Sequence, residues 1–258
     1  MKSADPLAGR GIVVTRPAHQ AMKLADLLRE AGARPIPFPV IEIADLDDPR
    51  PFAALIDRLD EFDLAIFVSP NAVGRAMTLI TSRRELPRGL TYAAVGSGSV
   101  RQLKKFGVTD VIAPARFDSE ALLALPAMAG VAGKRIAIFR GVGGREVLGE
   151  ALTARGAHVE YAECYRRACP STDPAPLFAA WDAGQLDAIT VTSSEGLHNL
   201  YAMIGPRGRQ RLLETALFAP HARIAGTAQE LHFSVVITTP QGDDGLLAGL
   251  RQWFGGKR

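Results

Sequence analysis

Residues 9–16 of the chain read GRGIVVTR, and residues 133–140 read GKRIAIFR, the same pattern shifted by 124 positions. The same shift, without a gap, aligns FDLAIFVS at residues 62–69 with LDAITVTS at residues 186–193. This period is far longer than the repeat unit of a solenoid and matches a whole domain. We therefore predict two similar domains that arose by duplication. Between them we expect a cleft, because clefts between domains are a preferred place for small-molecule sites.

Short apolar runs rich in β-branched residues predict the strands of these domains. Amphipathic patterns, such as residues 21–31 and 146–155, each stopped by a glycine, predict helices between the strands. The alternation of strand and helix indicates an α/β fold with parallel sheets. Residues 205–211, which read GPRGRQR, are predicted as a loop. The predicted strands span residues 12–15, 64–68, 92–95, 111–113, 136–139, 188–192, 222–225 and 235–238.

Two equivalent extended segments indicate how the chain passes between the domains. Residues 35–43 contain three prolines, which disfavour helix in their neighbours, and residues 159–167 occupy the same place in the second repeat. Two such segments suggest two crossings, so that one domain is discontinuous. The predicted domains are residues 1–38 with 168–258, and residues 43–163, with linkers at 39–42 and 164–167. Two consecutive domains are the alternative that periodicity alone leaves open.

The composition is that of an ordinary globular protein, with 47% hydrophobic and 22% charged residues among 258. We expect no membrane segment, because no apolar run of about 18 residues is present. Cys164 and Cys169 are too few for a disulfide framework, and we predict free thiols in a reducing cytoplasm. The net charge of +3 comes without a long basic run, which argues against nucleic-acid binding. Scattered arginines suit either a solvated surface or a polyanionic small molecule.

The turns that follow the predicted strands are rich in glycine, serine and threonine. In open parallel sheets ligands bind beyond the carboxyl ends of the strands, and free N–H groups with hydroxyls bind anions there. Any one of these serines or threonines, taken alone, is better explained as an ordinary helix N-cap. Several such turns directed into one cleft favour an anionic ligand. The candidate substrate-binding residues are Thr15, Arg16, Ser69, Asn71, Gly96, Ser97, Ser99, Arg140, Gly141, Gly143, Gly144, Ser193, Ser194 and Thr227.

Arg16 and Arg140 occupy equivalent strand ends in the two repeats. A guanidinium at this place can hold a carboxylate through two hydrogen bonds, or it can make a salt bridge to a neighbouring helix, and both interpretations stand. No metal is expected, since the five histidines are isolated. No organic cofactor is expected either, because neither glycine-rich turn completes a dinucleotide fingerprint and no Walker lysine is present.

Tyr165 lies in the second crossing segment, where the first crossing has Ile41. A phenol at the mouth of a cleft can donate or accept a hydrogen bond, although packing is the common reason for an interdomain tyrosine. Tyr165 is therefore a candidate functional residue without a counterpart in the other repeat.

Taken together and in order, these motifs make the whole chain resemble the uroporphyrinogen-III synthase family. The resemblance rests on VTRP at 14–17, FVSPNAV at 67–73, AVGSGS at 94–99, FRGVGGREVL at 139–148 and ECYRR at 163–167. It implies two flavodoxin-like α/β domains joined by a two-stranded linker, with one domain formed from both chain ends. It also implies a lyase of tetrapyrrole biosynthesis that needs no metal or organic cofactor. Such an enzyme cyclises linear hydroxymethylbilane to uroporphyrinogen III, with loss of water and inversion of ring D.

The resemblance also assigns roles to residues and partners. Tyr165 matches the family's linker tyrosine and is the candidate catalytic residue, while Ser69 and its repeat partner Ser193 match serines of the strand turns. Ser99 stands where many members carry threonine. The implied protein is a cytoplasmic monomer that makes a transient contact with the upstream deaminase. The alternatives are a non-catalytic binding protein or sensor for a tetrapyrrole or other polyanionic small molecule, and a nucleotide-dependent enzyme, against which the incomplete glycine motifs argue.

Overall fold

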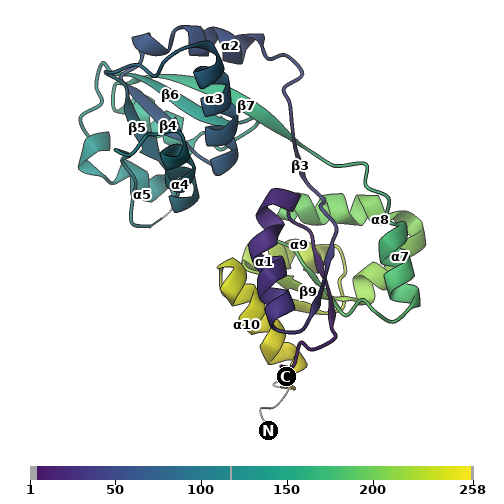
Figure 1. The fold of residues 1–258 in the computed structure, drawn as a ribbon. Coiled ribbons are helices and arrows are strands. Elements are labelled where there is room, and N and C mark those ends of the chain that lie inside the picture. The colour runs from purple at the N-terminus through teal and green to yellow at the C-terminus, as the bar shows by residue number, and fades with distance from the viewer. Residues whose placement is uncertain (1–4, 117, 257–258) are drawn as a thin grey trace. The chain divides into compact units, whose positions relative to one another are not determined.

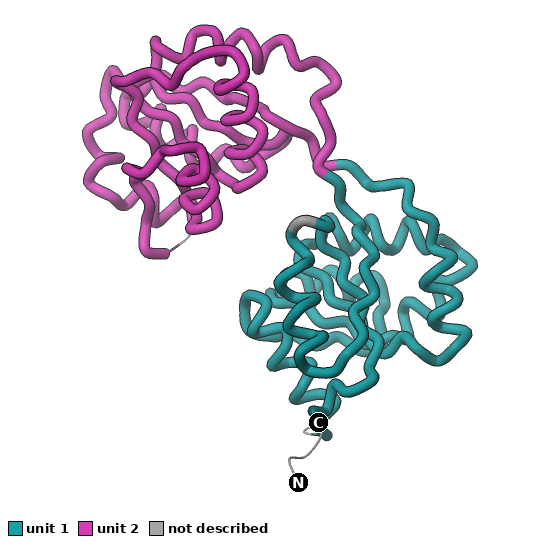
Figure 2. Tube along the Cα trace, in the orientation of Figure 1, with its two compact units in different colours: residues 1–42, 168–258 teal, residues 43–167 magenta. Residues whose placement is uncertain are grey.

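The computed structural model describes residues 5–116 and 118–256. The chain divides into two compact units, coloured separately in Figure 2. Unit 1 comprises Met1–Glu42 and Ala168–Arg258, and unit 2 comprises Ile43–Arg167. Within the described ranges, no helix is both long and apolar enough to cross a membrane.

Unit 1 is built on a parallel sheet of five strands in the order β10-β9-β8-β1-β2. Counted along this unit, the order is 5-4-3-1-2, which is the flavodoxin arrangement. Helices α1 and α10 pack on one face of the sheet and α7, α8 and α9 on the other (Figure 1). The elements are β1 Gly11–Val14, α1 Ala18–Glu30, β2 Arg34–Pro37, α7 Ala175–Asp182, β8 Ala188–Thr190, α8 Ser194–Glu214, β9 Ala216–Ala219, α9 Ala222–Glu230, β10 Val236–Thr238 and α10 Gly242–Phe254.

The apolar run of β1 explains its central position in this sheet. All four of its residues are buried, as expected of a parallel strand covered on both faces. Ile12 and Val14 pack toward α1 and α10, whereas Val13 packs toward α7, α8 and α9. The alternation of side chains along the strand therefore supplies both layers of the core.

Unit 2 has a sheet of five strands in the order β3-β7-β6-β4-β5, in which β7, β6, β4 and β5 run parallel. Phe67 and Phe139 stack with ring centroids 4.5 Å apart on the face covered by α2, α3 and α4. Helices α5 and α6 cover the other face. The elements are β3 Glu42–Ala44, α2 Arg50–Asp57, η1 Leu59–Glu61, β4 Leu64–Phe67, α3 Pro70–Arg83, β5 Thr91–Ala94, α4 Ser97–Lys105, α5 Ser119–Leu123, η2 Pro126–Met128, β6 Arg135–Gly141, α6 Val147–Ala154 and β7 His158–Ala168.

The 124-residue repeat relates the two units strand by strand. The shift brings β1 onto β6, β2 onto β7 and β4 onto β8, and it brings α4 onto α9. The order β7-β6-β4-β5 in unit 2 thus corresponds, strand for strand, to the order β2-β1-β8-β9 in unit 1. The chain visits the equivalent strands in a different sequence in the two units. An isolated bridge between Ile112 and Ala93 lies beside β5, where unit 1 has β10. The predicted α/β fold, with two parallel-sheet domains of which one is discontinuous, is confirmed.

Three local predictions are wrong. Residues 222–225 form the first turn of α9 and not a strand, because the buried side chains of Ile224, Ala225 and Ala228 have helical spacing. The strand of this region is β9, which ends at Ala219. The predicted loop at 205–211 lies within α8, which breaks at Gly205 with φ 64° and resumes at Pro206, since proline is tolerated in a first helical turn. The predicted strand at 111–113 is reduced to the single bridge at Ile112.

Candidate functional site

A pocket of about 250 Å³ lies at the carboxyl ends of β4, β5 and β6 in unit 2. It combines apolar walls from four aliphatic side chains with hydroxyl and guanidinium groups. Five of the predicted site residues meet here, namely Ser69, Arg140, Gly141, Gly144 and Tyr165. The other lining residues are Val68, Val95, Ser119, Ile138, Arg145, Leu148 and Arg167.

Tyr165 is held in this pocket by the pairing of β7 with β6. The register shifts after Arg140, so that Gly141 pairs with Tyr165, and the Val142 N–H donates to the Tyr165 carbonyl at 2.9 Å. The ring lies so close to Gly141 that a Cβ on that residue would come within 2.7 Å of it. Only 5% of Tyr165 is exposed, and its hydroxyl lies 3.1 Å from the Ser69 Oγ. The phenol oxygen therefore has a defined position among the polar groups of the pocket.

Ser69 is the N-cap of α3. Its extended backbone, with φ −155°, precedes Pro70 at the first helical position, and the Ala72 N–H donates to its Oγ at 3.1 Å. Ser193 caps α8 in the same way, accepting from the Gly196 N–H at 3.0 Å. Both serines thus act as helix caps, and Ser69 alone of this pair also contacts a tyrosine hydroxyl among the described residues.

Arg140 is buried and its guanidinium already has partners. Nη1 donates to the Gly144 carbonyl at 3.0 Å, Nη2 lies 3.3 Å from the Glu163 carboxylate, and the guanidinium carbon stacks 3.7 Å from the centre of the Tyr161 ring. Burial raises the pKa of the Tyr161 phenol, and the positive charge of Arg140 acts in the opposite direction. Arg140 therefore organises the wall of the pocket with its charge matched.

Arg16 is likewise paired, with Asp243 at the start of α10. Of the two interpretations of these arginines, the salt bridge to a neighbouring helix is observed for Arg16, whereas the 3.3 Å partner of Arg140 is Glu163 on the adjacent strand β7. A substrate carboxylate would have to compete with these partners or use the remaining donors, such as the Arg140 Nε, which has no hydrogen-bond partner among the described residues.

The other predicted residues of unit 2 lie outside the described lining of this pocket. Gly96 caps α4, and the Ser97 Oγ accepts from Arg101 at 3.3 Å. Ser99 is 1% exposed, and its Oγ finds no hydrogen-bond partner among residues 5–116 and 118–256. Asn71 lies in the first turn of α3, and Gly143 has φ +67° in the turn after β6. Of the ten predicted site residues in unit 2, counting Tyr165, five therefore line the pocket and five lie elsewhere at the same edge of the sheet.

In unit 1 the hydroxyls of three predicted residues, Thr15, Ser194 and Thr227, form hydrogen bonds between neighbouring elements. The Thr15 hydroxyl donates to the Thr190 carbonyl at 2.8 Å, and Thr190 in turn donates to the Val13 carbonyl at 2.9 Å. The Ser194 and Thr227 hydroxyl oxygens lie 3.0 Å apart. The sequence predicted Thr227 in a turn that follows a strand, and this is wrong. Thr227 lies inside α9, because the preceding strand already ends at Ala219.

Sequence reasoning missed three polar residues that line the pocket, Ser119, Arg145 and Arg167. Two of them had a usable signal. Arg145 closes the same glycine-rich turn as Arg140, and Arg167 lies two residues beyond Tyr165 on the same face of an extended strand. Ser119 begins α5, and no pattern in the sequence connects that helix with this edge of the sheet.

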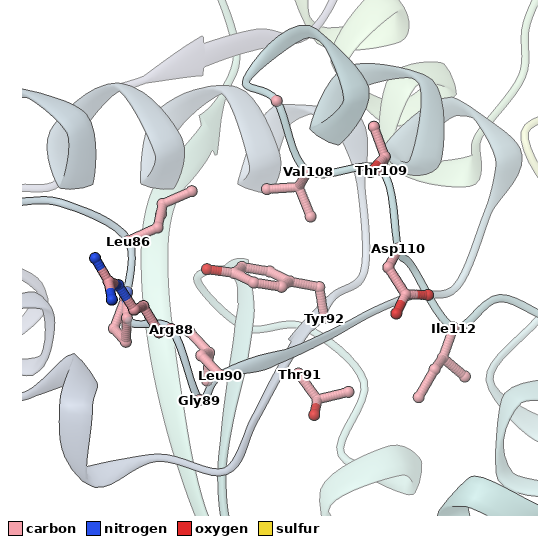
Figure 3. A pocket seen from close by; sticks show the side chains of 12 residues that line it. Leu86, Arg88, Gly89, Leu90, Thr91, Tyr92, Val108, Thr109, Asp110 and Ile112 are labelled. Carbon is pink, nitrogen blue, oxygen red and sulfur yellow. The ribbon is translucent and has the colours of Figure 1, made fainter.

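A second hollow of about 500 Å³ lies at the amino-terminal end of β5 (Figure 3). The figure shows the Tyr92 ring between Leu86, Arg88 and Val108, and burial raises the pKa of the Tyr92 phenol. Ligands of parallel sheets bind at the carboxyl ends of strands, which is the opposite end of β5. The pocket around Tyr165 is therefore the candidate active site.

Comparison with known proteins relates the whole chain to one family. The family model described as "Uroporphyrinogen-III synthase HemD" matches residues 22–248. The uroporphyrinogen-III synthase of Escherichia coli K12 is 35% identical over 244 residues, covering 93% of this chain and 99% of the relative. That of Synechococcus elongatus is 30% identical over 260 residues, covering 96% and 97%.

Solved structures show the same fold. A crystal structure of a mutant uroporphyrinogen III synthase from the extremely thermophilic bacterium Thermus thermophilus covers 96% of this chain and 100% of its own, with a TM-score of 0.61 and 17% identity. The uroporphyrinogen-III synthetase of Helicobacter pylori gives a TM-score of 0.55 at 13% identity, covering 93% of this chain and 97% of its own. At these identities the likeness supports the fold alone.

Proposed function

The chain belongs to the uroporphyrinogen-III synthase family, and from this premise we propose which of its residues carry the reaction. It is a hydro-lyase of tetrapyrrole biosynthesis that converts hydroxymethylbilane to uroporphyrinogen III, with loss of water and inversion of ring D. We assign the departure of water to the pocket of unit 2, with Tyr165 as the proton donor. The observation that carries the assignment is the fixed phenol oxygen, 3.1 Å from the Ser69 Oγ in a pocket at the carboxyl edge of a parallel sheet.

Loss of water from the substrate requires one weak acid that protonates the leaving hydroxyl. When the C–O bond breaks, the electron pair leaves with the oxygen, the Tyr165 proton completes the water molecule, and the pyrrole nitrogen stabilises the azafulvene that remains. Attack of ring D through its substituted carbon then gives a spiro intermediate, which fragments and recloses inverted. The reactive groups are the substrate's own, so the protein contributes mainly by holding one folded conformer.

The substrate carries eight carboxylates, and we propose that the predicted turns bind them. In unit 2 these turns contain Ser69, Asn71, Gly96, Ser97, Ser99 and the run from Arg140 to Gly144. In unit 1 they contain Thr15, Arg16, Ser193 and Ser194, with Thr227 reaching them through Ser194. Backbone N–H groups at helix starts supply the anion contacts, since the guanidiniums of Arg16 and Arg140 are already matched by carboxylates. Apolar side chains such as Val68 and Leu148 offer contact to a pyrrole face.

The test of the proton donor is Tyr165→Phe, assayed with hydroxymethylbilane generated enzymatically. We expect formation of uroporphyrinogen III to slow by about 10- to 1000-fold, the scale of losing one general-acid contact, while the spontaneous unflipped isomer accumulates. Full activity of the variant, with the wild-type isomer ratio, removes Tyr165 from the mechanism.

We also propose the setting in which this enzyme works. Segments 39–42 and 164–167 act as linkers between a domain of residues 1–38 with 168–258 and a domain of residues 43–163. The enzyme is a cytoplasmic monomer that receives its unstable substrate through a transient contact with the deaminase that makes it. The support for this contact is chemical, because free hydroxymethylbilane closes without inversion.

A further inference from the structure

Ser69 connects the Tyr165 hydroxyl to the N-terminus of α3. Its Oγ lies 3.1 Å from the Tyr165 oxygen on one side and accepts the Ala72 N–H at 3.1 Å on the other. A serine hydroxyl has one proton and two lone pairs. With one lone pair used by the backbone N–H, Ser69 still has its proton to donate.

We propose that Ser69 is a positioning residue that stabilises the phenolate of Tyr165, formed when Tyr165 gives its proton to the departing hydroxyl. This inference rests on the assignment of Tyr165 as proton donor. In the resting enzyme the two hydroxyls share one hydrogen bond. After the transfer, the phenolate oxygen has no proton, and the Ser69 O–H donates to it.

The N-terminus of α3 supports this donation in two ways. The Ala72 N–H polarises the Ser69 hydroxyl, which makes it a stronger donor through the cooperativity of linked hydrogen bonds. The positive end of the helix dipole, over the 14 residues of α3, also favours negative charge one side chain away. Tyr165 is 5% exposed, so little water competes for its oxygen and the contact acts at a low local dielectric.

The proton balance closes within the reaction. Tyr165 loses a proton to the leaving oxygen, which departs as water with the electron pair of the broken C–O bond. When the macrocycle closes, the ring carbon that forms the new C–C bond loses a proton to restore its pyrrole. Return of one proton to the phenolate regenerates the enzyme, so no further reagent is required.

The repeat provides an internal contrast. Ser193 caps α8 with the same geometry as Ser69. The first crossing segment, however, has isoleucine at position 41, where the second crossing has Tyr165. The cap is therefore the shared property of the two serines, and the contact with a phenol is the added one.

The test separates the hydroxyl from the cap. Glycine retains most of the N-cap preference but carries no hydroxyl, so Ser69→Gly removes the donor with little loss of helix stability. We expect kcat for uroporphyrinogen III to fall about 10- to 100-fold, with KM unchanged within about twofold, since the contact strengthens only as charge develops. Ser69→Thr, which keeps both hydroxyl and cap, retains kcat within about threefold. If Ser69→Gly lowers the melting temperature to that of the assay, all variants are compared at a lower temperature at which Ser69→Gly is folded.

The decisive measurement is a double-mutant cycle with Tyr165→Phe. If Ser69 acts through Tyr165, Ser69→Gly changes kcat by less than about twofold in the Tyr165→Phe background. An equal loss of kcat in both backgrounds means that Ser69 acts independently of Tyr165, and a raised KM with unchanged kcat means that its hydroxyl only binds the substrate. Either result overturns the proposed role. Full activity of Tyr165→Phe alone overturns the proton-donor assignment, and this outcome is visible before Ser69 is changed.

Discussion

At the scale of single residues, the candidate site depends on a close contact that leaves no room for a side chain. The Tyr165 ring lies over the backbone of Gly141, and a Cβ at that position would approach the ring carbons to 2.7 Å. Real Cβ contacts do not reach this distance, so any larger residue at 141 has to move the ring. The position of the phenol oxygen is thus decided partly by the absence of a methyl group.

We predict that Gly141→Ala lowers kcat at least about 10-fold, because a displacement of about 1 Å at a catalytic group has effects of this order. Overpacking should also lower the free energy of unfolding by about 1–3 kcal/mol. The matched control is Gly130→Ala, where the added Cβ meets nothing within 4 Å. Wild-type kcat in Gly141→Ala would contradict the position given to Tyr165.

The two cysteines differ in reactivity for a physical reason. Burial raises the pKa of the Cys164 thiol far above its ordinary value, and burial also raises the pKa of the exposed Cys169. Since the thiolate is the reactive form, both thiols react slowly at neutral pH, and Cys164 is in addition inaccessible.

We predict that a thiol reagent at pH 8 labels one cysteine per native molecule, Cys169, and two after denaturation. The raised pKa of Cys164 in the native protein also makes the free energy of unfolding depend on pH. Its contribution to stability is fully present below the pKa of the unfolded thiol, about 9. As the pH rises beyond that value, the unfolded chain loses the Cys164 proton first and stability falls. Rapid labelling of Cys164 in the native protein, tested with Cys169→Ala, would contradict its burial.

At the scale of elements, helical glycines separate into two kinds. Gly74 in α3 has an open surrounding, with the nearest atom to an added Cβ 3.8 Å away on the Gln102 side chain. Gly149 in α6 faces the Tyr161 hydroxyl, which an added Cβ would approach to 2.0 Å. Helix propensity alone would rank the two positions as equal.

We therefore expect opposite effects of the same substitution. Gly74→Ala should raise the free energy of unfolding by about 0.5–1 kcal/mol through helix propensity. Gly149→Ala should lower it by about 1–3 kcal/mol, because the Tyr161 ring and the stacked Arg140 have to shift. Chemical denaturation measures both, and a stabilised Gly149→Ala would mean that Tyr161 does not pack on α6 as described.

Elements also show where local pattern misled. The apolar character of residues 222–225 predicts a strand. The 124-residue shift, however, aligns these residues with α4, and it aligns β5 with β9. The 124-residue shift therefore carried the correct answer, because tertiary position in a duplicated fold outweighs the local preference of four residues.

At the scale of the whole molecule, each unit has its own hydrophobic core. The clusters around Met77 and around Leu148 belong to unit 2, and those around Leu200 and around Leu24 belong to unit 1. Both tryptophans, Trp181 and Trp253, lie in unit 1. Tryptophan fluorescence therefore reports the unfolding of unit 1 alone.

We predict that Met77→Ala, a cavity-forming change in unit 2, leaves the midpoint of the fluorescence transition unchanged. It should lower the midpoint of the unit 2 transition in circular dichroism, by an amount equivalent to about 2–5 kcal/mol. Leu200→Ala in α8 should shift the fluorescence transition instead. A common shift in both signals for Met77→Ala would mean that the units unfold as one.

The sequence by itself determined the 124-residue repeat and the α/β class, and it predicted the discontinuous domain and a ligand site at the carboxyl edge of each sheet. These properties follow from the periodicity of apolar residues and from the turn chemistry after each strand, which are local and repeat at a fixed interval. Only the tertiary structure decided the partners of individual side chains. It paired Arg140 with Glu163 and Arg16 with Asp243, buried Ser99, and set the Tyr165 hydroxyl beside Ser69. The physical reason is that these contacts join residues from 23 to 227 positions apart, and a strand register or a helix docking angle decides them, which no local pattern encodes.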